Sequence, residues 1–375
     1  MERMTNLFFI IFYLTPLTVV AFNDHGFYAN ACILLLILAY VAGKFVYHPT
    51  CKPVNYSYLF IEKSRSFVVL ALLYFILNRE DIFGIAENIH QGSFGTWALQ
   101  KAVDRYEEVA IIGFFQQVST IIFIYYCTLL GHSRITTLNL TALLLMIFVE
   151  SVSLSRASVV FGLTAFGTGH IISRSQDFQN LPRKKLIFIV FLVISLLLIV
   201  FGYSAVMRLQ AQTTEDILRI FFEKLQGYTI AIYDALLMWA PNTPIAPEGM
   251  GYDTLTFLYK LFGVTVPGGF YDSVTTKYGD TNVFTIIRGL LYDFGLLGTS
   301  LLVFIFSFGV KWFTYRSAGW MSFSMGRCMI FAFLSIIVSP FMFTTVTVGF
   351  VLGGAHILLL GRRSTDQRWK RKDKQ

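Results

Sequence analysis

The stretch from Thr281 to Phe306 reads TNVFTIIRGLLYDFGLLGTSLLVFIF. Most of it is apolar, and it is long enough for a helix that crosses a membrane, which takes about 20 residues. It nevertheless contains Arg288 and Asp293. A charge at membrane depth costs about 3 kcal/mol or more unless it faces protein or water. These two charges are therefore the first candidates for a functional role.

The rest of the chain has the same apolar character. Of its 375 residues, 55% are hydrophobic and 14% are charged, whereas soluble domains contain about 25% charged residues. We expect an all-α polytopic membrane protein, with residues 1–375 forming a single membrane domain of about ten (10–12) transmembrane helices. The spans are predicted near residues 6–22, 27–46, 66–84, 108–130, 135–153, 157–172, 186–206, 283–310, 323–339 and 341–360.

The distribution of basic residues predicts the orientation. With an even number of spans, most Lys and Arg of the short loops lie on one side, which the positive-inside rule makes cytoplasmic. Both termini are then cytoplasmic. The C-terminal tail, residues 361–375, contains seven basic and two acidic residues. We interpret it as an anchor that faces anionic membrane lipid, and we expect no nucleic-acid partner.

Two segments on the opposite side are long, and they cover residues 85–107 and 207–282. We call residues 207–282 the outer loop. It begins with TTEDILRIFFEKLQGY, residues 213–228, in which apolar residues recur at helical spacing opposite charged ones. This pattern predicts an amphipathic helix that lies on the outer membrane surface. A segment rich in Pro and Gly follows it.

Four arginines fall near the outer membrane boundary in this topology: Arg156, Arg208, Arg219 and Arg288. The guanidinium group matches phosphate geometry and stays charged at every relevant pH. A lipid-linked pyrophosphate lies at this depth and is a natural ligand for such a set. Simpler roles stay open for each arginine. For Arg208 the simpler role is snorkelling at the interface, and for Arg219 it is ion pairing along a helix. For Arg156 and Arg288 it is a buried salt bridge.

Three carboxylates lie near the same face: Asp293, Asp280 and Glu150. Each is a candidate general base, and Asp293 is equally well interpreted as a structural tie between segments. Arg288 and Asp293 are five residues apart, which is about 140° around a helix, so we expect them to face different partners. No metal site and no cofactor are expected, because the sequence lacks CxxC, P-loop, HExxH and nucleophile-elbow motifs.

Two short motifs are similar to a known family. SLSRAS, residues 153–158, and GDTNVFTIIRGLLYDFGLLG, residues 279–298, together with a long outer loop before the third-last span, resemble the bacterial O-antigen (oligosaccharide repeat-unit) polymerases of the Wzy family. The likeness in span number and order covers most of the chain. By position, Arg156 and Arg288 match the arginines of the family, and Asp293 matches its acidic residue. Arg208 and Arg219 match more loosely.

The resemblance implies a multi-pass glycosyltransferase of the bacterial inner membrane whose outer loop is periplasmic. Such enzymes transfer a growing polysaccharide from undecaprenyl pyrophosphate onto a lipid-linked repeat unit. The expected partners are the undecaprenyl pyrophosphate-linked oligosaccharide, membrane lipid, and the chain-length regulator and flippase of the same pathway. Two alternatives stay open. One is an O-antigen ligase, although ligases typically have a functional histidine in the outer loop and residues 207–282 contain none. The other is a lipid-linked oligosaccharide flippase or another transporter.

Overall fold

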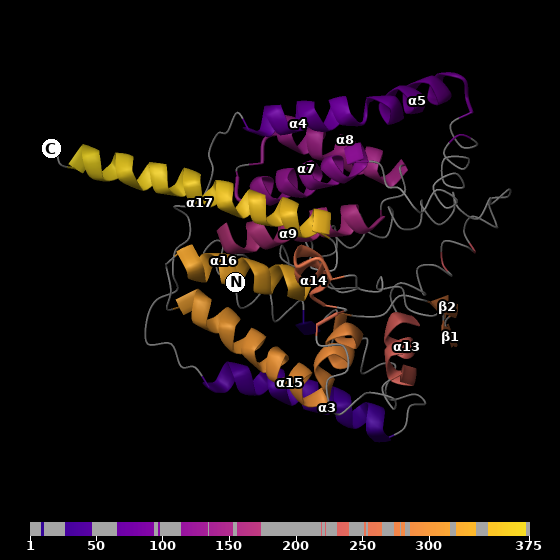
Figure 1. Cartoon of the computed structure of the whole chain (residues 1–375), viewed down its shortest axis with the longest axis vertical. Helices are drawn as coiled ribbons and strands as arrows, with labels where there is room; N and C mark the ends of the chain where they lie inside the picture. Colours follow the sequence, from indigo (N-terminus) through magenta and orange to yellow (C-terminus); the bar gives the residue numbers. More distant parts are fainter. Residues whose placement is uncertain are drawn as a thin grey trace. The chain divides into compact units, whose positions relative to one another are not determined.

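Long apolar runs of the sequence form helices in the computed structural model, which is mostly helical (Figure 1). The chain divides into two compact units, and each is described by itself. The structure describes residues 9–10, 27–46, 66–93, 97, 114–133, 135–152, 156–173, 219, 222, 231–239, 251–252, 254–264, 274–277, 279–281, 286–315, 320–334 and 344–372.

The first unit contains residues 1–55, 175–180 and 226–344. Its described elements are α3 (Phe27–Val46), α13 (Ile232–Trp239), α14 (Thr256–Leu261), β1 (Val274–Thr276), β2 (Gly279–Thr281), α15 (Ile286–Tyr315) and α16 (Trp320–Leu334). The two strands form an antiparallel hairpin in which Val274 pairs with Thr281 and Thr275 pairs with Asp280. The hairpin packs against α13, and α15 packs against both α3 and α16.

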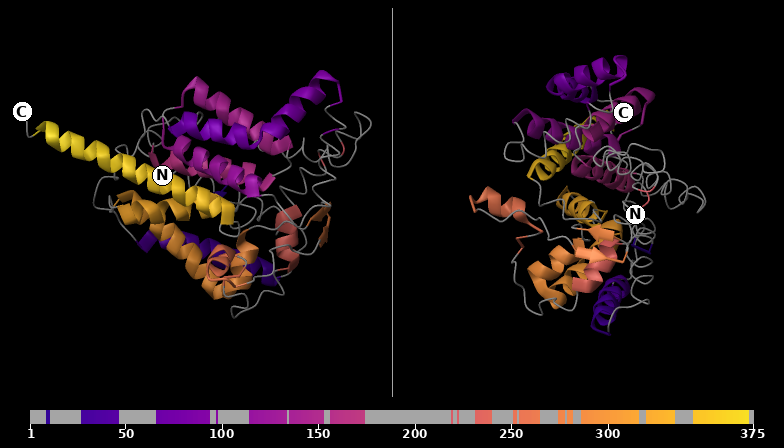
Figure 2. Two further views of the ribbon diagram at one scale, coloured as in Figure 1. Left: turned by 45° about the horizontal axis from the view of Figure 1, so that its top comes forward. Right: turned by 90° about the vertical axis from the view of Figure 1, so that its right-hand side faces the viewer.

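The second unit contains residues 56–174, 181–225 and 345–375. Its described elements are α4 (Ser66–Leu77), α5 (Arg79–His90), α7 (Phe114–Gly131), α8 (Thr137–Val152), α9 (Arg156–Ser173) and α17 (Thr344–Lys372). Helix α7 packs extensively on α9 and also contacts α4 and α8. The C-terminal part of α17 continues past the predicted span into the basic tail (Figure 2).

Small residues allow α3 and α15 to approach closely. A Cβ atom on Gly43 would lie 2.5 Å from the carbonyl oxygen of Phe304, so only glycine fits at this crossing. Two polar side chains then link the helices: Ser307 donates to the carbonyl of Tyr40 at 2.6 Å, and Lys311 donates to the carbonyl of Lys44 at 2.6 Å. Small residues and hydroxyl bonds at the crossing are typical of helix pairs in membranes.

Helix α15 is broken at Gly295, where φ is 65° and ψ is 179°. This conformation is essentially restricted to glycine. Ser and Thr hydroxyl groups in helices commonly donate to the carbonyl oxygen four residues back. The break removes this acceptor for the hydroxyl four residues after Gly295. Ser300 still donates to Leu296 at 2.8 Å. The buried hydroxyl of Thr299, whose fourth preceding residue is Gly295, has no hydrogen-bond partner among the described residues.

The second unit is organised around polar contacts between apolar helices. The predicted third span, residues 66–84, is interrupted in the structure, because α4 ends at Leu77 and α5 begins at Arg79. Asn78 lies at the break and donates to the hydroxyl of Ser119 on α7 at 2.5 Å. Further along α7, the hydroxyl of Tyr125 lies 2.5 Å from the Nδ1 atom of His356 on α17. Each contact fixes a neighbouring helix to α7.

We expect Gly131→Ala to destabilise the protein by about 1–3 kcal/mol, because the new methyl group overpacks the contact between α7 and α9. It would press on the carbonyl of Phe166 and lie 3.0 Å from the Cα atom of Gly169. Gly167→Ala in α9 is the matched control: its Cβ meets nothing within 4 Å, so better helix propensity stabilises it by up to about 1 kcal/mol. Melting temperatures in detergent test this, and equal shifts would contradict the packing.

One described helix differs from the rest in its length and apolar character. Among the described residues, only Ile287–Trp312 within α15 is both long and apolar enough to qualify as a span, and six further apolar helices have 10–17 residues. The helical class of the fold is confirmed, whereas the number of spans, their sidedness and the single membrane domain stay predictions. The predicted spans at 6–22 (apart from residues 9–10) and 186–206, and Arg208, lie outside the described residues.

Candidate functional site

Arg288 is the third residue of α15, and it faces a helix of the outer loop. Its Cζ atom lies 5.3 Å from the centroid of the Trp239 ring, at the C-terminal end of α13. The side chain is half-buried, and its Nη1 nitrogen is buried. A guanidinium over an indole face gains about 0.5–2 kcal/mol, depending on how far water is excluded. The contact positions the charge at the junction of the outer loop and the predicted span.

Asp293 lies further along the same helix and is fully buried. Its Oδ2 atom accepts two hydrogen bonds from Thr254, at 2.7 Å from the backbone N–H and at 2.6 Å from the hydroxyl. Bonds to a carboxylate are roughly twice as strong as bonds between neutral groups. Asp293 therefore ties the segment that precedes α14 to the first part of α15, two residues before the break at Gly295.

Arg288 and Asp293 thus have different partners, as their spacing predicts, and both partners belong to the outer loop. Helix α13 is itself buried, including Tyr233 and Asp234. Burial raises the pKa of the Tyr233 hydroxyl, so it stays protonated at any physiological pH. The hairpin that contains Asp280 packs on α13. The outer loop is in this way fixed on the start of α15 at two points.

Glu150 occupies a comparable position in the second unit. It is almost fully buried near the end of α8. Its two oxygens accept bonds from Tyr74 of α4 at 3.2 Å and from Ser158 of α9 at 2.5 Å. The carboxylate therefore joins three helices. Arg156 is the first residue of α9, and its side chain lies outside the described residues.

The seven residues singled out from the sequence belong to both units. Arg288, Asp293 and Asp280 lie in the first unit, whereas Glu150, Arg156 and Arg219 lie in the second, and Arg208 is outside the described residues. Arg219 is exposed, and of the predicted amphipathic helix 213–228 the structure describes only this residue and Phe222. Within the first unit, Arg288 and Asp293 lie on one helix, and each contacts a residue of the outer loop.

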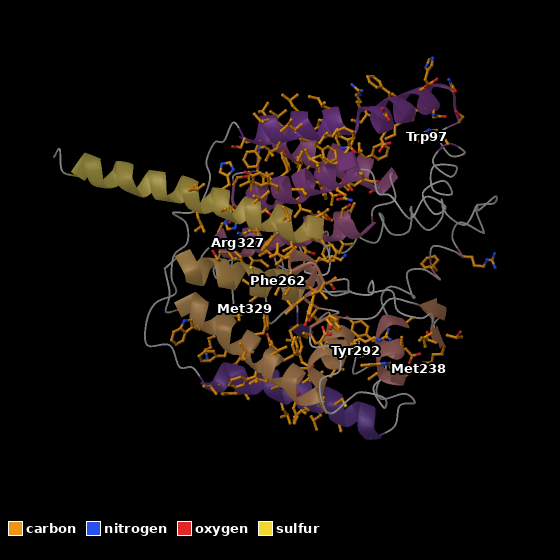
Figure 3. All side chains as sticks on the ribbon, viewed as in Figure 1. Trp97, Met238, Phe262, Tyr292, Arg327 and Met329 are labelled. Atoms are coloured by element: carbon orange, nitrogen blue, oxygen red, sulfur yellow. The ribbon has the colours of Figure 1, made fainter. Side chains whose placement is uncertain are left out.

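Sequence reasoning missed three residues of interest. Trp239 and Thr254 are the partners of Arg288 and Asp293. Arg327 is buried in α16 (Figure 3), in the middle of the run WMSFSMGRCMIFAFL. A lone arginine inside an apolar helix is a signal that the sequence does contain, since such a charge is stable only against protein or water. No local pattern distinguishes Trp239 or Thr254 from other residues of the loop.

The geometry defines a cation at the start of an apolar helix, with an aromatic ring beside it and a buried carboxylate seven residues into the helix. The guanidinium group in this arrangement is suited to bind an anion. Comparisons with protein-family models, with curated proteins and with solved structures find no match for this chain.

Proposed function

We propose that the chain is a membrane-embedded polymerase that joins lipid-linked oligosaccharide repeat units into O-antigen or a related surface polysaccharide. The observation that carries the proposal is the position of Arg288 at the start of the one described helix that qualifies as a span, against the outer-loop residue Trp239. A guanidinium at this depth suits the pyrophosphate of a carrier lipid. The resemblance of residues 279–298 to the Wzy family points to the same reaction.

In the proposed reaction, a hydroxyl of the lipid-linked repeat unit attacks the anomeric carbon of the first sugar on the growing chain. The new glycosidic bond forms as the bond to undecaprenyl pyrophosphate breaks, and the pyrophosphate leaves with the electron pair. Arg288 stabilises the negative charge that develops on the leaving oxygen, and this lowers the barrier because the interaction strengthens in the transition state. Arg156, Arg208 and Arg219 are the further candidates for binding pyrophosphate.

The proton of the acceptor hydroxyl goes to a general base, and the contacts rank the three candidates. The Oδ2 atom of Asp293 accepts two bonds from Thr254, and both oxygens of Glu150 accept bonds from neighbouring helices. Both carboxylates are thus already occupied in holding the fold, and we assign them a positioning role. We propose Asp280 as the base because of its position on the hairpin of the outer loop; its side chain lies outside the described residues.

Deletion of the gene tests the function directly. In a strain that produces this surface polysaccharide, we expect the deletion to leave single repeat units on the lipid acceptor, and the wild-type gene to restore the ladder of longer chains on a gel. This result separates the proposed function from its alternatives. Loss of all attached sugar would favour a ligase or a flippase, and an unchanged ladder would exclude all three roles.

A further inference from the structure

Helix α14 and its flanking residues have an inverted distribution of polarity. The buried side chains at its start are Thr254 and Thr256, whereas the exposed ones, apart from Lys260, are apolar. Leu261 is 66% exposed and Phe262 is 79% exposed, and Leu258 and Val264 are exposed as well. A helix on a water-soluble surface has the opposite pattern, with its apolar side toward the protein. The exposed face of α14 is therefore suited to contact with an apolar environment.

Backbone hydrogen bonds close this segment at both ends. The backbone N–H of Leu255 donates to Gly251 at 2.8 Å and begins the turn before the helix. At the other end, Gly263 adopts a φ of 74°, and the N–H of Val264 donates to the carbonyl of Tyr259 at 2.9 Å. This is the capping pattern in which a left-handed glycine closes a helix. The cap fixes Phe262 and Val264 beside the exposed face.

The depth of α14 follows from its anchor on α15. Asp293 holds Thr254, and it lies seven residues after the start of α15, so about 10 Å along the helix axis. Leu297 follows four residues later, and with Leu301 it begins the exposed apolar face of the predicted span. Helix α14 is thus attached at the level where the span begins to face lipid. It stands apart from the other helices of its unit (Figure 2).

We propose that α14 lies in the outer leaflet of the bilayer, with Leu258, Leu261 and Phe262 among the acyl chains of membrane lipid. Lys260 is exposed between the apolar residues. A lysine in this position extends its ammonium toward the phosphate level while its methylene groups stay in the apolar layer. The inference rests on the outer-face topology of the proposed function, and it does not depend on the reaction.

Fluorescence quenching in lipid nanodiscs tests the depth of α14. The four native cysteines, Cys32, Cys51, Cys127 and Cys328, are replaced, and one new cysteine is labelled with an environment-sensitive dye. Phe262→Cys probes α14, and Thr275→Cys, at an exposed position of the β1–β2 hairpin, is the matched control. We expect doxyl-labelled lipids to quench the dye at position 262, and aqueous iodide to quench it several-fold less than the dye at position 275.

Two outcomes would overturn the inference. Equal quenching by iodide at both positions would place α14 in water. Protection of position 262 from iodide without quenching by doxyl lipids would mean that protein covers α14 instead of lipid. Labelled protein that elutes from size exclusion at the wild-type volume shows that the variants fold. The proposed function is tested separately by the polysaccharide ladder of the deletion strain, so failure of one experiment does not decide the other.

Discussion

Cells that produce Arg288→Ala in place of the wild-type protein are expected to lose the polysaccharide ladder. Removing one preorganised positive donor from a developing oxyanion lowers a reaction rate by about 100-fold or more. Arg288→Lys keeps the charge but loses both the planar fork and the stacking on Trp239, so we expect partial activity, reduced by about tenfold. The measurement is the chain-length distribution on a gel, with the membrane level of each variant determined by blotting.

Arg79→Ala is the matched control for this experiment. Arg79 begins α5, is exposed, and lies near the outer end of the predicted span 66–84. It tests whether the loss of any outer arginine is enough to reduce the ladder, and we expect it to leave the ladder intact. If Arg288→Ala accumulates to the wild-type level and still produces long chains, then Arg288 does not bind the leaving pyrophosphate and the proposed site is wrong.

Asp293→Ala is expected to release the segment around α14 from α15. The substitution removes the acceptor of two hydrogen bonds and leaves the N–H and hydroxyl of Thr254 buried without it. This costs about 2 kcal/mol or more, which favours local opening about thirtyfold. Lys260 is exposed on α14, so limited trypsin digestion followed by mass spectrometry should show faster cleavage after this residue. Cleavage after the exposed Arg79 is the internal reference and should not change.

Asp293→Asn distinguishes the structural role of the hydrogen bonds with Thr254 from a catalytic role of the negative charge. The amide oxygen still accepts hydrogen bonds from Thr254, so trypsin should cleave after Lys260 only a few-fold faster than in the wild type. If Asp293 acts only by positioning, this variant also retains most of the polysaccharide ladder. A variant that resists trypsin like the wild type but makes no ladder would return Asp293 to the role of general base.

The helices are the part of this protein that local sequence predicts well. A run of apolar residues without proline predicts a helix at 27–46, and α3 occupies these residues. Asn78 and Arg79 interrupt the next apolar run, 66–84, and the chain breaks there into α4 and α5. These features depend on the composition of short windows, because about 20 consecutive apolar residues and a polar interruption are both local properties.

The partners in the candidate site are not local properties. Thr254 lies 39 residues before Asp293 in the chain. Trp239 lies still further from Arg288, and both partners belong to a loop whose path depends on long-range packing. The break at Gly295 is equally hard to predict, because the sequence around it contains other glycines that stay helical, such as Gly298. Spacing along the helix did predict correctly that the two charges face different partners.

The break at Gly295 has a consequence for how one helix serves two environments. The nine residues before it, which include Arg288 and Asp293, are attached to the outer loop, whereas the residues after it are packed against α3. The non-helical backbone at Gly295 interrupts the helix between these two halves. In the proposed polymerase, the half that contains Arg288 and Asp293 would then move with the outer loop while the half after Gly295 stays packed against α3.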